Sequence, residues 1–128
     1  MIIDRSNLNL KTLFTHPKYF WRELAAIFQR GVNGYAPQDT WDLGYYFVRV
    51  YADALKHFKK VSYAYPGQLT EKQWDKILDE MIEGFEAGLD GYYDLAITDE
   101  EKAKQQELQK KYNKALKLFL KWHESIWY

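Results

Sequence analysis

The sequence predicts an all-α protein, a compact bundle of four main helices, and three observations support this fold class. Four segments place apolar residues three and four positions apart, which is the spacing of one helix face. Each segment is bounded by residues that begin or end helices. β-Branched residues, which favour strands, are few, since the 128 residues include only four valines. We expect a single domain over residues 1–128, with an N-terminal segment at 1–15 and a long C-terminal helix at 98–128.

The first predicted helix covers residues 17–30. Pro17 suits the first helical turn, where its missing N–H costs no hydrogen bond, and Gly31 suits a left-handed residue that ends the helix. Val32 would then pack back against Ile27. The side chains expected to be buried are Phe20, Leu24, Ile27 and Phe28.

The second predicted helix covers residues 41–61 and follows a loop rich in turn-forming residues. Asp39 or Thr40 is expected to cap it, because a short side-chain oxygen can accept a hydrogen bond from the first helical turn. The expected apolar face consists of Leu43, Phe47, Val50, Tyr51, Ala54 and Phe58.

The third predicted helix begins with a capping box formed by Thr70 and Gln73. Three glycines, Gly84, Gly88 and Gly91, lie beside its apolar stripe. Two interpretations are open: the glycines allow a neighbouring helix to approach closely, or Gly88 ends the helix. The stripe itself consists of Trp74, Ile77, Leu78, Met81, Ile82, Phe85 and Leu89.

The last predicted helix begins with a second capping box, Thr98 with Glu101. Farther along, its apolar residues alternate at spacings of four and three, which is the pattern of a coiled-coil seam. The seam spans only about two and a half heptads, so an ordinary bundle helix also explains it. We expect self-association through an interface formed by Leu108, Tyr112, Phe119, Trp122 and Ile126.

Composition restricts the possible functions. Eighteen basic residues balance eighteen acidic ones, so we do not expect a nucleic-acid partner, which usually requires a basic excess. The absence of cysteine excludes thiolate catalysis and zinc sites that need sulfur. No apolar run approaches the length of a membrane span and the start lacks the pattern of a signal peptide, so we expect no membrane partner and an intracellular location.

An acidic stripe on the third predicted helix is the strongest sign of catalysis. It resembles the acidic helices of all-α nucleotide pyrophosphohydrolases, in which carboxylates hold Mg²⁺ against phosphates. Those enzymes pair an E-E-x-x-E helix with an E-x-x-D helix, whereas here Glu80 and Glu83 have no such partner on the next helix. We therefore expect a solvated face, with no catalytic residue, metal or cofactor. The stripe consists of Asp75, Asp79, Glu83, Glu86, Asp90 and Asp94.

A candidate ligand-binding set surrounds the start of the second predicted helix. It combines two planar cations with three rings, which suits a flat anionic ligand or a protein partner. In the alternative interpretation, Arg30 pairs with Asp39 to brace the loop while Trp41 fills the core. The set consists of Arg30, Tyr35, Trp41, Tyr46 and Arg49.

Residues 28–88 resemble a family of small proteins of tailed bacteriophages and prophages. The pattern contains Arg30-Gly31, D-x-W-x-L-x-x-Y at 39–46, Tyr65-Pro66 and L-T-x-x-x-W-x-x-I-L-x-x-M-I-x-x-F at 69–85. The resemblance implies a phage setting and implies nothing about catalysis. We therefore expect a non-enzymatic binding protein that acts in the host cytoplasm on a host component, in antagonism of host defence. The alternatives are a protein that sequesters a small nucleotide-like anion and a Mg²⁺-dependent nucleotide pyrophosphohydrolase.

Overall fold

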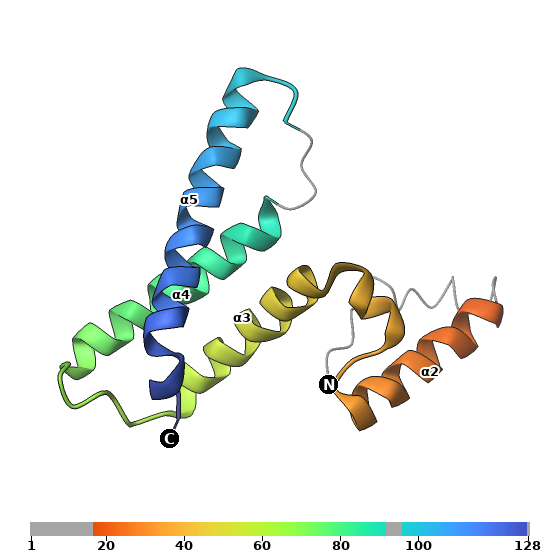
Figure 1. Cartoon of the computed structure of the whole chain (residues 1–128), viewed down its shortest axis with the longest axis horizontal. Helices are drawn as coiled ribbons and strands as arrows, with labels where there is room; N and C mark the ends of the chain where they lie inside the picture. Colours follow the sequence, from red (N-terminus) through yellow and green to blue (C-terminus); the bar gives the residue numbers. More distant parts are fainter. Residues whose placement is uncertain (1–16, 92–95, 128) are drawn as a thin grey trace. The chain divides into compact units, whose positions relative to one another are not determined.

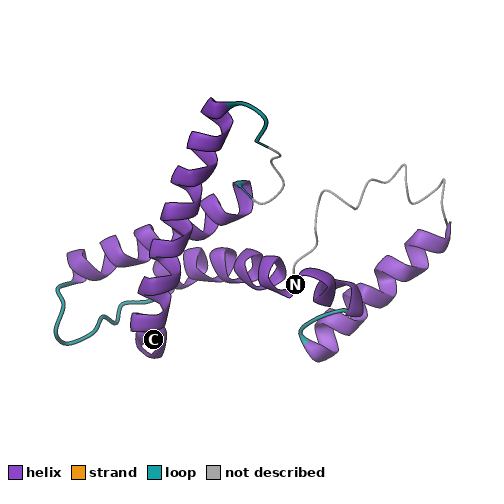
Figure 2. Cartoon of the chain, turned by 45° about the horizontal axis from the view of Figure 1, so that its top comes forward, coloured by secondary structure: helices purple, strands orange, loops and turns teal. Residues whose placement is uncertain are grey.

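The computed structural model describes residues 17–91 and 96–127, and the all-α prediction is confirmed. Within these residues four α-helices follow one another, and Figure 1 labels them. They are α2 (Pro17–Asn33), α3 (Leu43–Val61), α4 (Glu71–Asp90) and α5 (Asp99–Trp122), with the short 3₁₀ helices η1 (Pro37–Asp42) and η2 (His123–Ser125). Figure 2 shows only helices and loops in this part of the chain. The predicted N-terminal segment at 1–15 lies outside the described residues.

The chain divides into two units, Met1–Tyr46 and Phe47–Tyr128. The second unit holds the hydrophobic core, which draws side chains from α3, α4 and α5. Phe85 at its centre is fully buried and meets the rings of Tyr51 and Phe119 edge to face. Each large side chain buried in this way contributes about 1.5–3 kcal/mol. The buried residues of the core are Val48, Ala52, Leu55, Phe58, Trp74, Leu78, Met81, Ile82, Phe85, Ala115 and Trp122.

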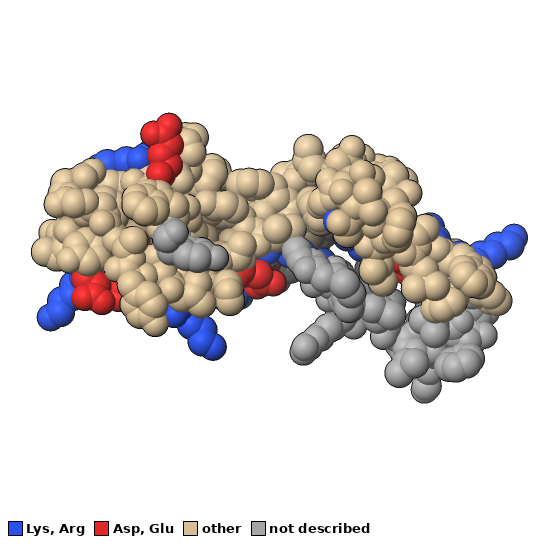
Figure 3. Space-filling model, turned by 90° about the horizontal axis from the view of Figure 1, so that it is seen from below, with Lys and Arg blue, Asp and Glu red and all other residues tan. Residues whose placement is uncertain are grey.

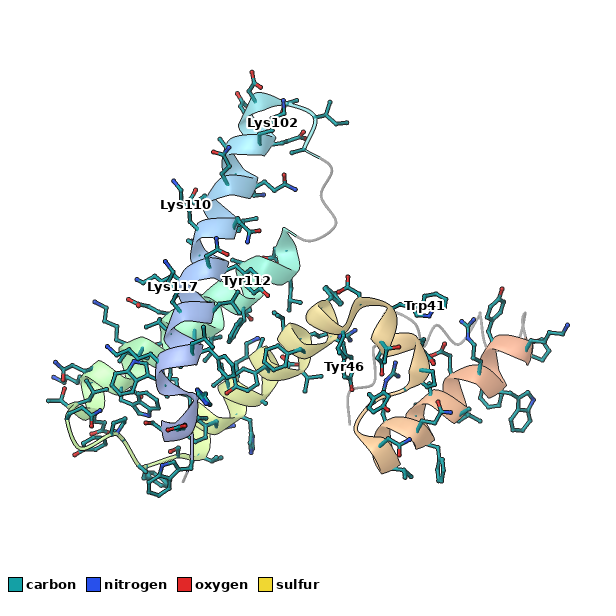
Figure 4. All side chains as sticks on the ribbon, viewed as in Figure 1. Trp41, Tyr46, Lys102, Lys110, Tyr112 and Lys117 are labelled. Atoms are coloured by element: carbon teal, nitrogen blue, oxygen red, sulfur yellow. The ribbon has the colours of Figure 1, made fainter. Side chains whose placement is uncertain are left out.

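Helices α4 and α5 pack closely because α4 has glycine at two positions that face α5, where any side chain would overlap it. A Cβ on Gly84 would lie 2.5 Å from the carbonyl oxygen of Lys111, and it would also overlap the methyl group of Ala115. A Cβ on Gly88 would lie 2.6 Å from the ring of Tyr112, which Figure 4 places between the two helices. The first interpretation of these glycines is therefore correct, and α4 continues past Gly88 to Asp90.

Both predicted capping boxes are confirmed. The Thr70 hydroxyl accepts from the Gln73 N–H at 3.3 Å, and the Gln73 side chain accepts from the Thr70 N–H at 2.9 Å. Thr98 and Glu101 repeat the arrangement at the start of α5. The last helix is shorter than predicted, since α5 ends at Trp122 and η2 follows it.

The coiled-coil-like seam of α5 is used inside the second unit. Ala115 and Trp122 are buried, Trp122 against Trp74 with ring centroids 5.9 Å apart. The remaining seam residues Tyr112, Phe119 and Ile126 are half-buried against the same core, and Leu108 is half-buried beside Gly91. The seam residues thus contribute to the core of one chain, and their assignment to an interface between copies (Leu108, Tyr112, Phe119, Trp122 and Ile126) stays a prediction.

In the first unit, α2 is longer than predicted, and it exposes side chains that were expected to be buried. The helix continues through Gly31 to Asn33, and Gly34 is the left-handed residue, with φ +81°. The N–H of Gly34 closes the helix by donating to the carbonyl oxygen of Arg30. Leu24 and Phe28, expected to be buried, are exposed, and only Ala26 of this helix is buried.

The predicted second helix also needs correction. Its first residues form η1, and α3 begins at Leu43. Leu43, Phe47 and Ala54 of the predicted apolar face are exposed, while Val48, Ala52 and Leu55 are buried. The buried face is therefore turned by about a quarter of a helical turn from the predicted one.

Candidate functional site

The candidate set begins with an ion pair that closes the loop between α2 and α3. The Arg30 guanidinium donates from Nε to Oδ2 of Asp39 at 2.8 Å and from Nη2 to Oδ1 at 2.5 Å. Such paired, charge-assisted bonds fix both planes relative to each other. The hydrogen bond to Asp39 raises the pKa of Arg30, so the guanidinium stays charged. The interpretation that Arg30 braces the loop is correct.

Asp39 also holds the backbone of the loop. Its Oδ2 accepts a hydrogen bond from the N–H of Ala36 at 2.8 Å, and Ala36 is completely buried. The cap of α3 is provided by Asp42, whose Oδ1 accepts from the N–H of Tyr45 at 3.0 Å. The predicted choice of Asp39 or Thr40 as the cap of this helix was wrong, because both residues lie within η1, which precedes α3.

Tyr46 contributes a further brace, and Figure 4 shows its ring turned back toward the loop. Its hydroxyl donates to the carbonyl oxygen of Gly34 at 2.8 Å. Because Gly34 is the left-handed residue that ends α2, this bond fixes the exit of the chain from the helix. Arg30 and Tyr46 therefore shape the loop from its two ends.

The other two rings of the candidate set, Trp41 and Tyr35, face solvent. Trp41 is 91% exposed on η1, and Figure 4 shows it extending away from the ribbon. Tyr35 is 47% exposed. Trp41 does not fill a core, so that half of the alternative interpretation is wrong. A tryptophan held in water by a braced loop is a typical anchor for a binding partner.

Arg49, the fifth member of the predicted set, lies half-buried on α3 in the second unit. The first unit therefore brings together Arg30, Tyr35, Trp41 and Tyr46, with two braces and two exposed rings. A flat anionic ligand would need a cation to bind it. In this unit the Arg30 guanidinium already donates from two of its nitrogens to Asp39, which weakens the case for such a ligand.

The sequence interpretation missed the outer face of α2. Trp21, Phe28 and Val32 are each exposed by about two thirds or more, and Leu24 by 41%. Helical periodicity identified an apolar stripe here, but it could not show that the stripe faces solvent. The aromatic content of 18% was the one available sign that some rings serve a surface.

Two members of the acidic stripe of α4 pair with lysines of α3, Asp79 with Lys59 at 2.5 Å and Glu86 with Lys56. Glu80, beside the stripe, pairs with Lys114 of α5 at 3.0 Å. Within the described residues no group of three or more acidic or histidine side chains is arranged to hold a metal, and Asp94 lies outside them. On the face shown in Figure 3, acidic and basic groups are scattered without a large area of one sign.

A small cleft lies in the second unit. It has a volume of about 20 Å³ and lies among the end of α3, the following loop and the start of α4. That space holds about one water molecule and is far too small for a nucleotide. The indole N–H of Trp74 is buried beside this cleft, and no described residue accepts a hydrogen bond from it.

No family model matches this chain, and neither a curated protein nor a solved structure is significantly similar to it. Among the described helices, none combines the length and apolar character needed to cross a membrane. The function must therefore be argued from the loop and the exposed face of the first unit.

Proposed function

We propose that this chain is a non-enzymatic binding protein that recognises a host protein during phage infection, in antagonism of host defence. The observation that carries the proposal is the 91% exposure of Trp41 on a loop that the Arg30–Asp39 pair holds in one conformation. Binding energy concentrates in exposed rings of this kind, because they bury a large area at little entropic cost. The phage setting comes from the resemblance of residues 28–88.

The loop is suited to recognition because it is ordered before a partner arrives. Arg30, Asp39 and Tyr46 make four side-chain hydrogen bonds across residues 30–46. Ordering a loop on binding would consume part of the interaction free energy, and a loop already fixed avoids that loss. Tyr35 and Leu43 are also exposed in this segment and extend the contact area.

The engagement of Arg30 by Asp39 weighs against the nucleotide-sequestering alternative, and the lysine pairs of α4 weigh against the hydrolase. The proposal therefore places the chain among proteins that bind other proteins, without a cofactor.

The experiment is affinity capture of the tagged chain from infected cells, with bound proteins and bound nucleotides both identified. We expect a host protein in the eluate. Trp41→Ala should lower its recovery and weaken binding of the purified pair by about thirtyfold, or about 2 kcal/mol. Because the side chain is so exposed, the melting temperature should stay at the wild-type value.

Tyr63→Ala provides the matched control, because Tyr63 is 93% exposed and lies in the second unit. This variant should retain full binding and activity in an infection assay. Full binding by Trp41→Ala would remove the site, and a bound nucleotide without a bound protein would favour the sequestering alternative.

A further inference from the structure

A second surface of the first unit lies on α2 and is distinct from the loop. Trp21, Leu24, Phe28 and Val32, here called the α2 stripe, are exposed by 67%, 41%, 72% and 67%. At 100° per residue these four positions fall within about 80° of one another, so they form a single row along the helix. Monomeric proteins rarely expose a continuous apolar row of this extent.

The α2 stripe is not the face that attaches α2 to the loop. Arg30, which pairs with Asp39, lies about 180° around the helix from Trp21. The single buried residue of α2, Ala26, lies on that same side. Among the described residues of the first unit, Arg30 and Ala26 make their contacts from one side of α2, and the most apolar side of the helix is exposed.

We propose that the α2 stripe is the interface with a second copy of this chain, in an antiparallel pair of α2 helices. The four side chains expose roughly 500 Å² per copy, and a stable interface buries about 800 Å² per partner. The stripe alone therefore corresponds to an interface at the small end of the range.

The sizes of the side chains match in this orientation. In an antiparallel pair centred near residue 26, Trp21 of one copy lies against Val32 of the other, and Leu24 lies against Phe28. A large side chain thus meets a smaller one at every level, which is how facing helices fill space without voids. A two-fold axis repeats each contact, as a self-complementary interface requires.

The charges along the stripe also favour an antiparallel second copy. Lys18 and Arg22 flank the stripe near the start of α2, and its second half is flanked by the neutral Gln29. Antiparallel pairing places these cations beside the C-terminal half of the other helix, where free carbonyl groups carry partial negative charge. A parallel pair would bring the same cations of the two copies together.

Light scattering and sedimentation of the full chain test the proposal, which stands independently of Trp41 and its partner. We expect a dimer at micromolar concentration and at least a thirtyfold weaker dimer for Phe28→Glu. Leu120→Glu is the matched control, because Leu120 is 70% exposed but lies on α5, and it should remain dimeric. A monomeric wild type would overturn the proposal, whether residues 1–16 or another protein covers the stripe. A dimer that persists in Phe28→Glu would overturn it as well.

Orientation can be tested with single cysteines, since the sequence contains none. In the antiparallel pair the two copies of residue 32 lie about 16 Å apart along the helices, far beyond the reach of a disulfide of about 7 Å. Val32→Cys alone should therefore stay unlinked under mild oxidation, whereas a mixture with Trp21→Cys should crosslink. Rapid crosslinking of Val32→Cys alone would show a parallel pair and refute the antiparallel arrangement.

Discussion

At the scale of single residues, the two capping boxes differ in charge, because an amide completes one and a carboxylate completes the other. The box of α4 uses the neutral Gln73, and the box of α5 uses Glu101. The Glu101 carboxylate accepts from the N–H groups of Thr98 and Ile97, both at 2.9 Å. These bonds lower the pKa of Glu101 below its ordinary value, because they favour the charged form.

The lowered pKa makes the stability of α5 depend on pH. A carboxylate with a lower pKa in the folded state stabilises the protein above its unfolded pKa of about 4.3, and this contribution is lost as pH falls through the folded value. Glu101→Gln keeps a side-chain oxygen that can accept these hydrogen bonds, and it removes the titratable carboxyl group. We expect the melting temperatures of wild type and variant to respond differently to acid only below about pH 5.

Thermal melts followed by circular dichroism between pH 7 and pH 3 provide the measurement for Glu101. The reciprocal variant Gln73→Glu is the control, since it should introduce the same acid-dependent loss at α4. Parallel pH curves for the wild type and Glu101→Gln would show that the capping carboxylate does not contribute.

At the scale of elements, the glycines give the sharpest prediction. Gly84→Ala would push a methyl group against the Lys111 carbonyl, which is backbone and cannot rotate away. Separating α4 from α5 should lower the free energy of unfolding by about 1–3 kcal/mol. Gly31→Ala is the control within a helix, because no atom lies within 4 Å of its Cβ position.

Urea denaturation should show opposite signs for these two glycine variants. Gly31→Ala removes backbone freedom from the unfolded chain and should stabilise α2 by about 0.5–1 kcal/mol. If Gly84→Ala were as stable as the wild type, the close approach of the two helices would not depend on this glycine.

The sequence predicts elements better than it predicts their faces. The stripe of α4 is correct because seven apolar residues lie on one side and polar residues cover the rest. Phe28 of α2 and Leu43 of α3 were placed inside because periodicity shows which residues share a face, but not whether another helix covers that face. The buried face of α3 includes the smaller Val48 and Ala52, and large side chains drew the prediction away from them.

At the scale of the whole molecule, the two units differ in how they are stabilised. The second unit has eleven buried residues in its core cluster, whereas the described part of the first unit buries only Ala26 and Ala36. The aromatic content of the sequence could not show this division, because it does not distinguish rings in a core from rings on a surface. The candidate site was predicted in part: Tyr35 and Trp41 are exposed, while Arg30 and Tyr46 hold the loop.

We expect dilution to affect the two units differently. A helix of 17 residues without a buried apolar face is marginal in water, so α2 should lose helicity as dimers dissociate. Hydrogen exchange at high and low protein concentration measures this, with α4 amides as the internal control. Equal protection of α2 at both concentrations would contradict the expectation.

The uncovered side of α2 also has a consequence for the cell. Because the proposed dimer stabilises α2, mass action makes the helicity of this segment depend on the concentration of the chain. When few copies of the chain exist, the proposed dimer would dissociate and the part of α2 before Arg30 would fray. As synthesis proceeds, the same sequence would acquire structure without any modification or ligand, so that expression level alone would act as the switch.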